Sequence, residues 1–104
     1  MSASGEVVVQ KFGGTSVASP ARIKRACRRV AETVRSGRRV VVVVSAMGAT
    51  TDRLIALAHR VSADPPAREM DMLVANGETI TAPLVAMCLQ GLGVPALSLS
   101  GLQA

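Results

Sequence analysis

Aromatic side chains are almost missing from this chain of 104 residues, because Phe12 is the only one and tyrosine and tryptophan do not occur. The chain also has a single histidine, His59, and two cysteines, Cys27 and Cys88, that lie far apart in the sequence. Without a Cys/His cluster a structural zinc site is not expected, and His59 is interpreted as a surface residue of a helix. Both cysteines fall on apolar helix positions, which favours buried thiols over a disulfide.

Long hydrophobic runs are scarce too. We expect no membrane-spanning segment and no membrane partner. The first six residues lack the charged and apolar regions of a signal peptide, so we expect a cytoplasmic protein with residues 1–5 as a flexible terminus. Apolar residues make up 49% of the chain and are nearly all aliphatic, a composition that suits a sheet covered by helices.

Acidic residues are outnumbered, and the formal net charge is +5. Eight of the twelve basic residues lie between Arg22 and Arg39, where Glu32 is the only acid. Such a cluster is typical either of a nucleic-acid surface or of a solvated helix face. The lack of aromatic stacking platforms favours the solvated face, so nucleic acid is not expected as a partner.

Hydrophobic periodicity divides the chain into short strands and amphipathic helices. Ser19 is the predicted N-cap of the first helix, with Pro20 at its first position and Gly37 as its stop. The expected elements, in order, are a strand over 7–11, a helix over 20–36, a strand over 39–45, a helix from about 51 to 62, helical segments over 68–89 with a break at 76–79, and a strand over 96–100.

This order predicts an α/β fold with a parallel sheet sandwiched by helices and with right-handed crossovers, truncated after about three strands. Val40 to Val44 show no alternation, so the second strand is predicted to be buried on both faces. The open edge of so small a sheet is expected to favour aggregation. Lys11, Ser45 and Ser100 fall at the carboxyl ends of the strands, where such sheets bind ligands.

The most informative motif joins the first strand to the first helix, over residues 10–17, and reads QKFGGTSV. Glycines let the backbone approach an anion closely, successive N–H groups can point into it, and a lysine adds positive charge. The alternative is a tight strand-to-helix turn with a solvated lysine. Neither the Walker loop nor the dinucleotide-binding fingerprint matches this string.

The string from Lys11 to Val17 resembles the signature of aspartate kinases, in the amino-acid kinase superfamily. The resemblance implies the amino-acid/carbamate kinase-like fold, with residues 1–104 as the N-terminal portion of the catalytic domain. It also implies transfer of the γ-phosphoryl group of MgATP to the β-carboxylate of L-aspartate, which gives 4-phospho-L-aspartate and begins lysine, threonine and methionine biosynthesis. Further segments that match the same family in the expected order are 43–48, 51–52, 68–73, 77–78 and 99–104.

The resemblance implies catalytic roles for Lys11, which would contact the transferring phosphoryl group, and for Glu78, which would bind the α-ammonium group of the substrate. Mg²⁺ would be bound through the nucleotide, and no protein metal ligand is expected. The residues implied to bind ATP or phosphate are Lys11, Phe12, Gly13 and Gly14. The residues implied to bind aspartate are Ser45, Thr51 and Glu78.

Structural roles compete with these assignments. Ser45 could simply end a strand, Thr51 or Asp52 could cap the next helix, and Glu78 could be a first-turn acid. Aspartate kinases continue well beyond this length, so the isolated chain is expected to be inactive and the full-length enzyme to be a homo- or hetero-oligomer. The alternatives left open are a related kinase with another substrate and a non-catalytic module that binds a nucleotide or a partner.

Overall fold

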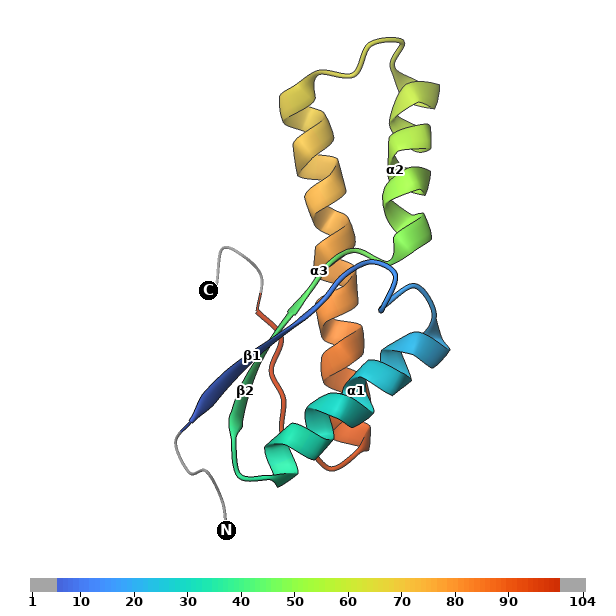
Figure 1. Cartoon of the computed structure of the whole chain (residues 1–104). Helices are drawn as coiled ribbons and strands as arrows, with labels where there is room; N and C mark the ends of the chain where they lie inside the picture. Colours follow the sequence, from blue (N-terminus) through green and yellow to red (C-terminus); the bar gives the residue numbers. More distant parts are fainter. Residues whose placement is uncertain (1–5, 100–104) are drawn as a thin grey trace.

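The computed structural model describes residues 6–99, without the side chain of Glu78. In this range a parallel sheet of two strands, β1 (Val7–Phe12) and β2 (Arg39–Val44), packs against helices (Figure 1). The helices are α1 (Pro20–Arg35), α2 (Gly48–Val61) and α3 (Ala67–Gly91). The predicted α/β arrangement with parallel strands is confirmed. The expectation for residues 1–5 lies outside the described residues.

The sheet is covered on one face within the described residues. Side chains alternate along a strand, so each strand presents one set to the helices and the other set away from them. On β2, Val41 and Val43 are 51% and 44% exposed. The prediction that the valine run is buried on both faces is therefore wrong for this structure. The residues of β2 that pack against the core are Val40, Val42 and Val44.

Helix α1 begins and ends where the sequence predicts. Ser19 Oγ accepts a hydrogen bond from the Arg22 backbone N–H at 3.3 Å, and Pro20 occupies the first helical position. Gly37 follows the last turn with a φ of 94°, a left-handed conformation that glycine adopts without a steric penalty. The buried face of the helix consists of Ile23, Ala26, Cys27, Val30 and Ala31.

Helix α3 is continuous, so the predicted break over residues 76–79 is wrong. A Cβ built on Gly77 would lie 3.0 Å from the Cβ of Ala46, which shows how closely α3 approaches the segment before α2. Thr81, which is fully buried, donates from Oγ1 to the Gly77 carbonyl at 3.3 Å. The helix continues through Pro83, although this residue removes one backbone hydrogen bond from it.

Helix α2 begins at Gly48, three residues before the predicted start at Thr51. Met47 occupies the N-cap position and provides no side-chain hydrogen bond. Sequence rules locate a helix start by a capping oxygen, so they misplaced this one. Residues 48–50, which precede the predicted start, form the first turn of the helix.

The third strand expected over 96–100 does not form in its described part. Pro95 has no backbone N–H, and the carbonyl of Ala96 accepts a hydrogen bond from Gln90 Nε2 at 3.0 Å. The backbone donor at Pro95 is therefore missing, and the carbonyl of Ala96 already accepts a hydrogen bond, so neither joins a sheet. Ser100, which was expected at the end of this strand, lies outside the described residues.

Helix α3 is long and apolar enough to cross a membrane by length and composition, which corrects the expectation that no segment is. The helix packs against α1, α2 and β2, and it buries Val85, Ala86 and Leu89. Core helices of soluble proteins often meet the same criterion, so this finding is weak evidence of a membrane segment.

Cys27 and Cys88 are free, as predicted, but they meet across the interface between α1 and α3. Cys27 is fully buried, and its Sγ lies 3.7 Å from the carbonyl oxygen of Val85, one turn before Cys88 on α3. Burial, the hydrogen bond with Cys88 and the charge interaction with Cys88 raise the pKa of Cys27 from 9.0 to about 12.

The Cys27 thiol is expected to make stability depend on pH above pH 9. The unfolded thiol loses its proton near its ordinary pKa of 9.0, whereas the folded one keeps it up to about pH 12. The contribution is therefore fully present below pH 9 and is lost as the pH rises toward 12, by up to about 1.4 kcal/mol per pH unit. Urea unfolding at about pH 8 and about pH 10, followed by circular dichroism, measures the difference.

Cys27→Ala is the control for this prediction. The substitution lowers the free energy of unfolding at both pH values because it leaves a cavity, but it removes the titrating thiol. The decrease between the two pH values should thus be smaller in Cys27→Ala than in the parent chain. Equal decreases in the two proteins would show that Cys27 does not titrate differently in the folded state.

Candidate functional site

The carboxyl ends of β1 and β2 lie side by side, and each leads through a turn into a helix (Figure 1). The backbone N–H of Ser45 donates to the Phe12 carbonyl at 3.1 Å, which extends the strand pairing by one residue. The turn over 13–19 leads into α1, and the turn over 45–47 leads into α2. This is the edge of an open α/β sheet at which ligands bind.

The glycine turn after β1 offers backbone donors. The Ser16 N–H donates to the Gly13 carbonyl at 3.0 Å and closes the turn. Arg22 Nη1 donates to the Thr15 carbonyl at 2.9 Å and ties the turn to α1. Among the backbone hydrogen bonds of residues 6–99, none uses the amide of Gly14 or Thr15. These two N–H groups are therefore free to bind an anion.

Gly14 lies where the two turns touch. A Cβ built on it would lie 3.2 Å from the carbonyl oxygen of Ala46 and 3.7 Å from the Cα of Gly48. A Cβ built on Gly13 would meet nothing within 4 Å. Neither glycine has a positive φ, so backbone conformation alone does not require glycine at either position. Packing requires a glycine at position 14, while position 13 is open to an approaching ligand.

Alanine substitutions should separate these two glycines. Gly14→Ala is expected to lower the free energy of unfolding by about 1–3 kcal/mol, because the new methyl group presses on the rigid backbone of the second turn. Gly13→Ala is expected to change it by less than about 0.5 kcal/mol. Urea unfolding of both variants checks the prediction. Equal effects would mean that the two turns do not touch in solution.

The start of α2 adds a second group of donors to this edge. A helix N-terminus carries a partial positive charge and free N–H groups, and Met47 supplies no side-chain cap here. The contact of Gly14 with Gly48 places this N-terminus against the glycine turn. Sequence reasoning did not select Met47 or Gly48 as site residues. Their position at the site depends on the contact between Gly14 and Gly48, which lie in different turns and meet only in the folded chain.

The structure gathers the positions implied to bind aspartate. Ser45 and Thr51 are both half-buried, at the end of β2 and in the first turn of α2. A Cβ built on Gly77 would lie 3.5 Å from Thr50 Cγ2, so Gly77 packs against the first turn of α2. Glu78 is the next residue in the chain, and its backbone therefore lies near the same turn. The side chain of Glu78, and with it the predicted catalytic carboxylate, lies outside the described residues.

Lys11 is exposed, one residue before the end of β1. It borders a hollow of about 380 Å³ that Gly13, Gly14, Ser45 and Thr51 do not line. Lys11 and the glycine turn thus do not line this hollow together, although they are neighbours in sequence. The residues that line this hollow are Gln10, Lys11, Phe12, Arg29, Glu32 and Thr33.

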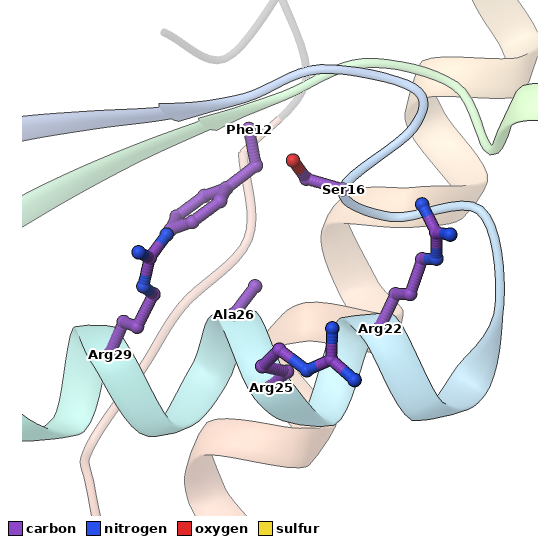
Figure 2. Close-up of a pocket in the computed structure, with 6 residues that line it drawn as sticks. All are labelled: Phe12, Ser16, Arg22, Arg25, Ala26 and Arg29. Atoms are coloured by element: carbon purple, nitrogen blue, oxygen red, sulfur yellow. The ribbon is translucent and has the colours of Figure 1, made fainter.

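A smaller hollow of about 310 Å³ lies beside the glycine turn, between β1 and α1 (Figure 2). We call it the basic hollow, and its lining residues are Phe12, Ser16, Arg22, Arg25, Ala26 and Arg29. Phe12, which is implied to belong to the phosphate-binding segment, is 8% exposed and forms part of the core as well as the wall of this hollow.

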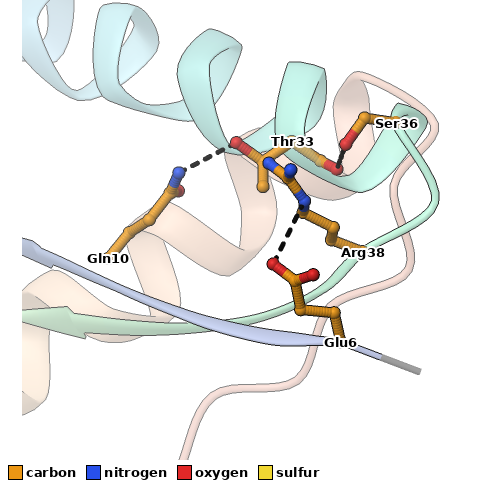
Figure 3. Close-up of polar contacts among 5 residues, drawn as sticks. All are labelled: Glu6, Gln10, Thr33, Ser36 and Arg38. Atoms are coloured by element: carbon orange, nitrogen blue, oxygen red, sulfur yellow. Dashed lines mark hydrogen bonds and ion pairs between the residues drawn. The ribbon is translucent and has the colours of Figure 1, made fainter. Parts of the chain in front are cut away.

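One polar contact joins α1 to β1, and another joins the residues that precede β1 and β2 (Figure 3). Gln10 Nε2 donates to Thr33 Oγ1 at 2.9 Å, and Arg38 Nε lies 3.5 Å from Glu6 Oε1. The Gln10 Oε1 atom is buried and without a partner. No group of three or more metal-ligating side chains occurs among the residues that the structure describes.

Known proteins match this chain over most of its length. Residues 6–104 match the Amino acid kinase family. An aspartokinase from Mycolicibacterium smegmatis is 56% identical over 98 residues, which cover 94% of this chain and 23% of that protein. An aspartokinase from Bacillus sp. (strain MGA3) is 55% identical over 94% of this chain and 24% of that protein.

A crystal structure of aspartate kinase from Synechocystis superposes with a TM-score of 0.84 and 48% sequence identity, over 89% of this chain and 16% of that one. The chain thus spans about a quarter of the length of the curated relatives it matches, in their N-terminal part. The resemblance of the motifs to aspartate kinases is confirmed by these matches. On the strength of the matched residues and the shared fold, the chain belongs to the amino acid kinase family.

Proposed function

We propose that this chain is the N-terminal portion of an aspartate kinase catalytic domain. The complete enzyme transfers the γ-phosphoryl group of MgATP to the β-carboxylate of L-aspartate and gives 4-phospho-L-aspartate. One observation carries the proposal: the glycine turn and the start of α2 meet at the carboxyl edge of parallel strands, with the amides of Gly14 and Thr15 free. A 56% identity to an aspartokinase supports it.

Phosphoryl transfer requires positioning and stabilisation of charge rather than covalent chemistry by the protein. The free amides of Gly14 and Thr15 would bind phosphate oxygens, and the bound Mg²⁺ of the nucleotide would neutralise further charge. Lys11 has a flexible side chain with a compact charge, and it would reach the transferring phosphoryl group from the edge of β1. Gly13 has open space above it, so the nucleotide can approach the backbone there.

Aspartate would be bound by the polar positions around the start of α2. The hydroxyl groups of Ser45 and Thr51 can donate to the substrate carboxylates. Glu78, as a carboxylate, would pair with the α-ammonium group. All three residues belong to segments that converge on the same turn of the structure, which is what a single small substrate requires.

The isolated chain is proposed to be inactive, because transfer requires both substrates to be held in line and this chain spans about a quarter of its relatives. The complete enzyme would be an oligomer in the cytoplasm and would begin the synthesis of lysine, threonine and methionine. ATP and L-aspartate would be its ligands, with no membrane or nucleic-acid partner.

A chimera tests the proposal. Residues 6–104 of this chain replace the matching N-terminal part of the aspartokinase from M. smegmatis, and ATP-dependent formation of aspartyl hydroxamate is measured. We expect activity with L-aspartate and none with glutamate or N-acetylglutamate, and no activity from the isolated chain. A folded chimera that is inactive with aspartate, or an isolated chain that is active, would contradict the proposal.

A non-catalytic module that binds a partner is the second candidate, and the uncovered face of the sheet favours it. Val9 is 65% exposed there, in a patch with the exposed residues Val7, Val41 and Val43. Apolar patches of this kind mark interaction surfaces. An inactive chimera, together with tight binding of the isolated chain to the remainder of an aspartokinase, would support this role over catalysis.

A further inference from the structure

The basic hollow on α1 has no part in the proposed transfer reaction. Arg22, Arg25 and Arg29 are three and four residues apart on the helix, so they form one stripe that faces the hollow. Figure 2 shows their side chains around the same space, with the Ser16 hydroxyl opposite them on the turn. Three guanidinium groups and one hydroxyl thus line a space of about 310 Å³.

The positive charge of this hollow is not neutralised within the described residues. The ion pairs between residues 6 and 99 join Arg38 to Glu6 and Arg68 to Glu69, and neither pair lies at the hollow. Glu32, the only acid on α1, lines the neighbouring hollow, which shares Arg29 with this one, and forms no ion pair with that arginine. Like charges held this close repel one another, so the arrangement favours a bound anion.

The basic hollow adjoins the hollow that Lys11 borders, since Phe12 and Arg29 line both, but Lys11 itself does not line the basic hollow. Lys11 and Phe12 are consecutive residues of β1, so their side chains point to opposite faces of the sheet. Phe12 points to the face covered by α1, where it forms a wall of the hollow. An anion in the hollow would contact α1 rather than the outer face of the sheet.

We propose that the basic hollow binds a compact anion with two or more phosphate groups. Guanidinium groups form paired hydrogen bonds with phosphate oxygens, and three of them match a chain of phosphates better than a single carboxylate. Ser16 adds a neutral hydroxyl donor from the turn. The side chain of Arg22 is already held by the Thr15 carbonyl, which reduces the entropy lost on binding.

Titration calorimetry of the full 104-residue chain with inorganic triphosphate tests this proposal. Arg25→Gln and Arg29→Gln are each expected to weaken binding about tenfold, since a hydrogen bond to a charged group contributes at least that much. Arg28→Gln is the matched control, because Arg28 lies on the same helix, has the same charge and does not line the hollow. We expect it to change binding by less than about twofold. Circular dichroism confirms that the variants are folded.

Three other outcomes overturn the proposal. An equal loss with Arg28→Gln would mean unspecific attraction to a basic chain. A larger loss with Lys11→Ala than with Arg25→Gln would place the triphosphate in the neighbouring hollow that Lys11 borders. Binding of a DNA oligonucleotide that is tighter than that of triphosphate and is weakened equally by all three arginine substitutions would indicate a nucleic-acid surface. One outcome supports the proposal. If ATP binds with the same affinity as triphosphate, and Arg25→Gln weakens the binding of both equally, then the hollow recognises the phosphates alone.

Discussion

In the aspartokinase chimera that carries this chain, Lys11→Ala is expected to lower kcat by about 10²- to 10³-fold. The substitution removes the positive charge that would stabilise the phosphoryl group in the transition state. Lys11 is exposed in the structure, so its loss should leave the fold intact. The KM for aspartate should change little, because the lysine acts on charge that develops during transfer. Hydroxamate formation over a range of substrate concentrations measures both constants.

Lys24→Ala is the matched control, since Lys24 is the only other lysine in the chain. It is exposed on α1 and lines neither of the two hollows, so the substitution removes the same charge at a distance from the glycine turn. We expect its kcat to stay within about twofold of the parent chimera. A normal kcat in Lys11→Ala, or the same decrease in both variants, would show that position 11 has no specific role in transfer.

The features of the fold that the sequence predicted correctly depend on local signals. Ser19, Pro20 and Gly37 determine the ends of α1 through their own hydrogen-bonding and conformational properties, and the structure places all three as expected. The valine-rich strands pair in parallel because a helix of sixteen residues connects them. Such signals act over a few residues, so they can be read without knowledge of tertiary contacts.

The predictions that failed depend on contacts between distant segments. Asn76 and Gly77 look like a helix break in the sequence, but the glycine fits against Ala46 and the helix continues. The strand after Pro95 failed because Gln90 takes a carbonyl that a sheet would have used. Burial of both sheet faces was predicted from the lack of alternation in β2, yet the second face is not covered within residues 6–99.

Only part of the candidate site could be predicted, because the rest of it also depends on contacts between distant segments. The motif located Lys11, Gly13 and Gly14, because these residues adjoin one another in the sequence, and the family resemblance implied the catalytic role of Lys11. The contact between Gly14 and Gly48, which brings the start of α2 to the glycine turn, joins residues more than thirty positions apart. The sequence already places Ser45 at this edge of the sheet, but only the folded chain reveals that the start of α2, which carries Thr51, lies against the glycine turn.

Phe12→Ala is expected to lower the free energy of unfolding by about 3–5 kcal/mol. Phe12 is 8% exposed and packs in the core with Val17 and the buried face of α1. It is the only aromatic side chain available to fill that space. A domain of this size is stable by only about 5–15 kcal/mol, so the substitution removes a large share of its stability. Since the chain lacks tryptophan and tyrosine, far-UV circular dichroism during urea titration is the suitable measurement.

Phe12→Leu separates the loss of volume from the loss of the aromatic ring. Leucine keeps most of the buried apolar surface, so a decrease of less than about 1.5 kcal/mol is expected. The dependence on urea concentration should keep the same slope in both variants if only stability has changed. A decrease below about 1 kcal/mol in Phe12→Ala would mean that the ring is not buried between β1 and α1. The core and the wall of the basic hollow would then have to be assigned to other residues.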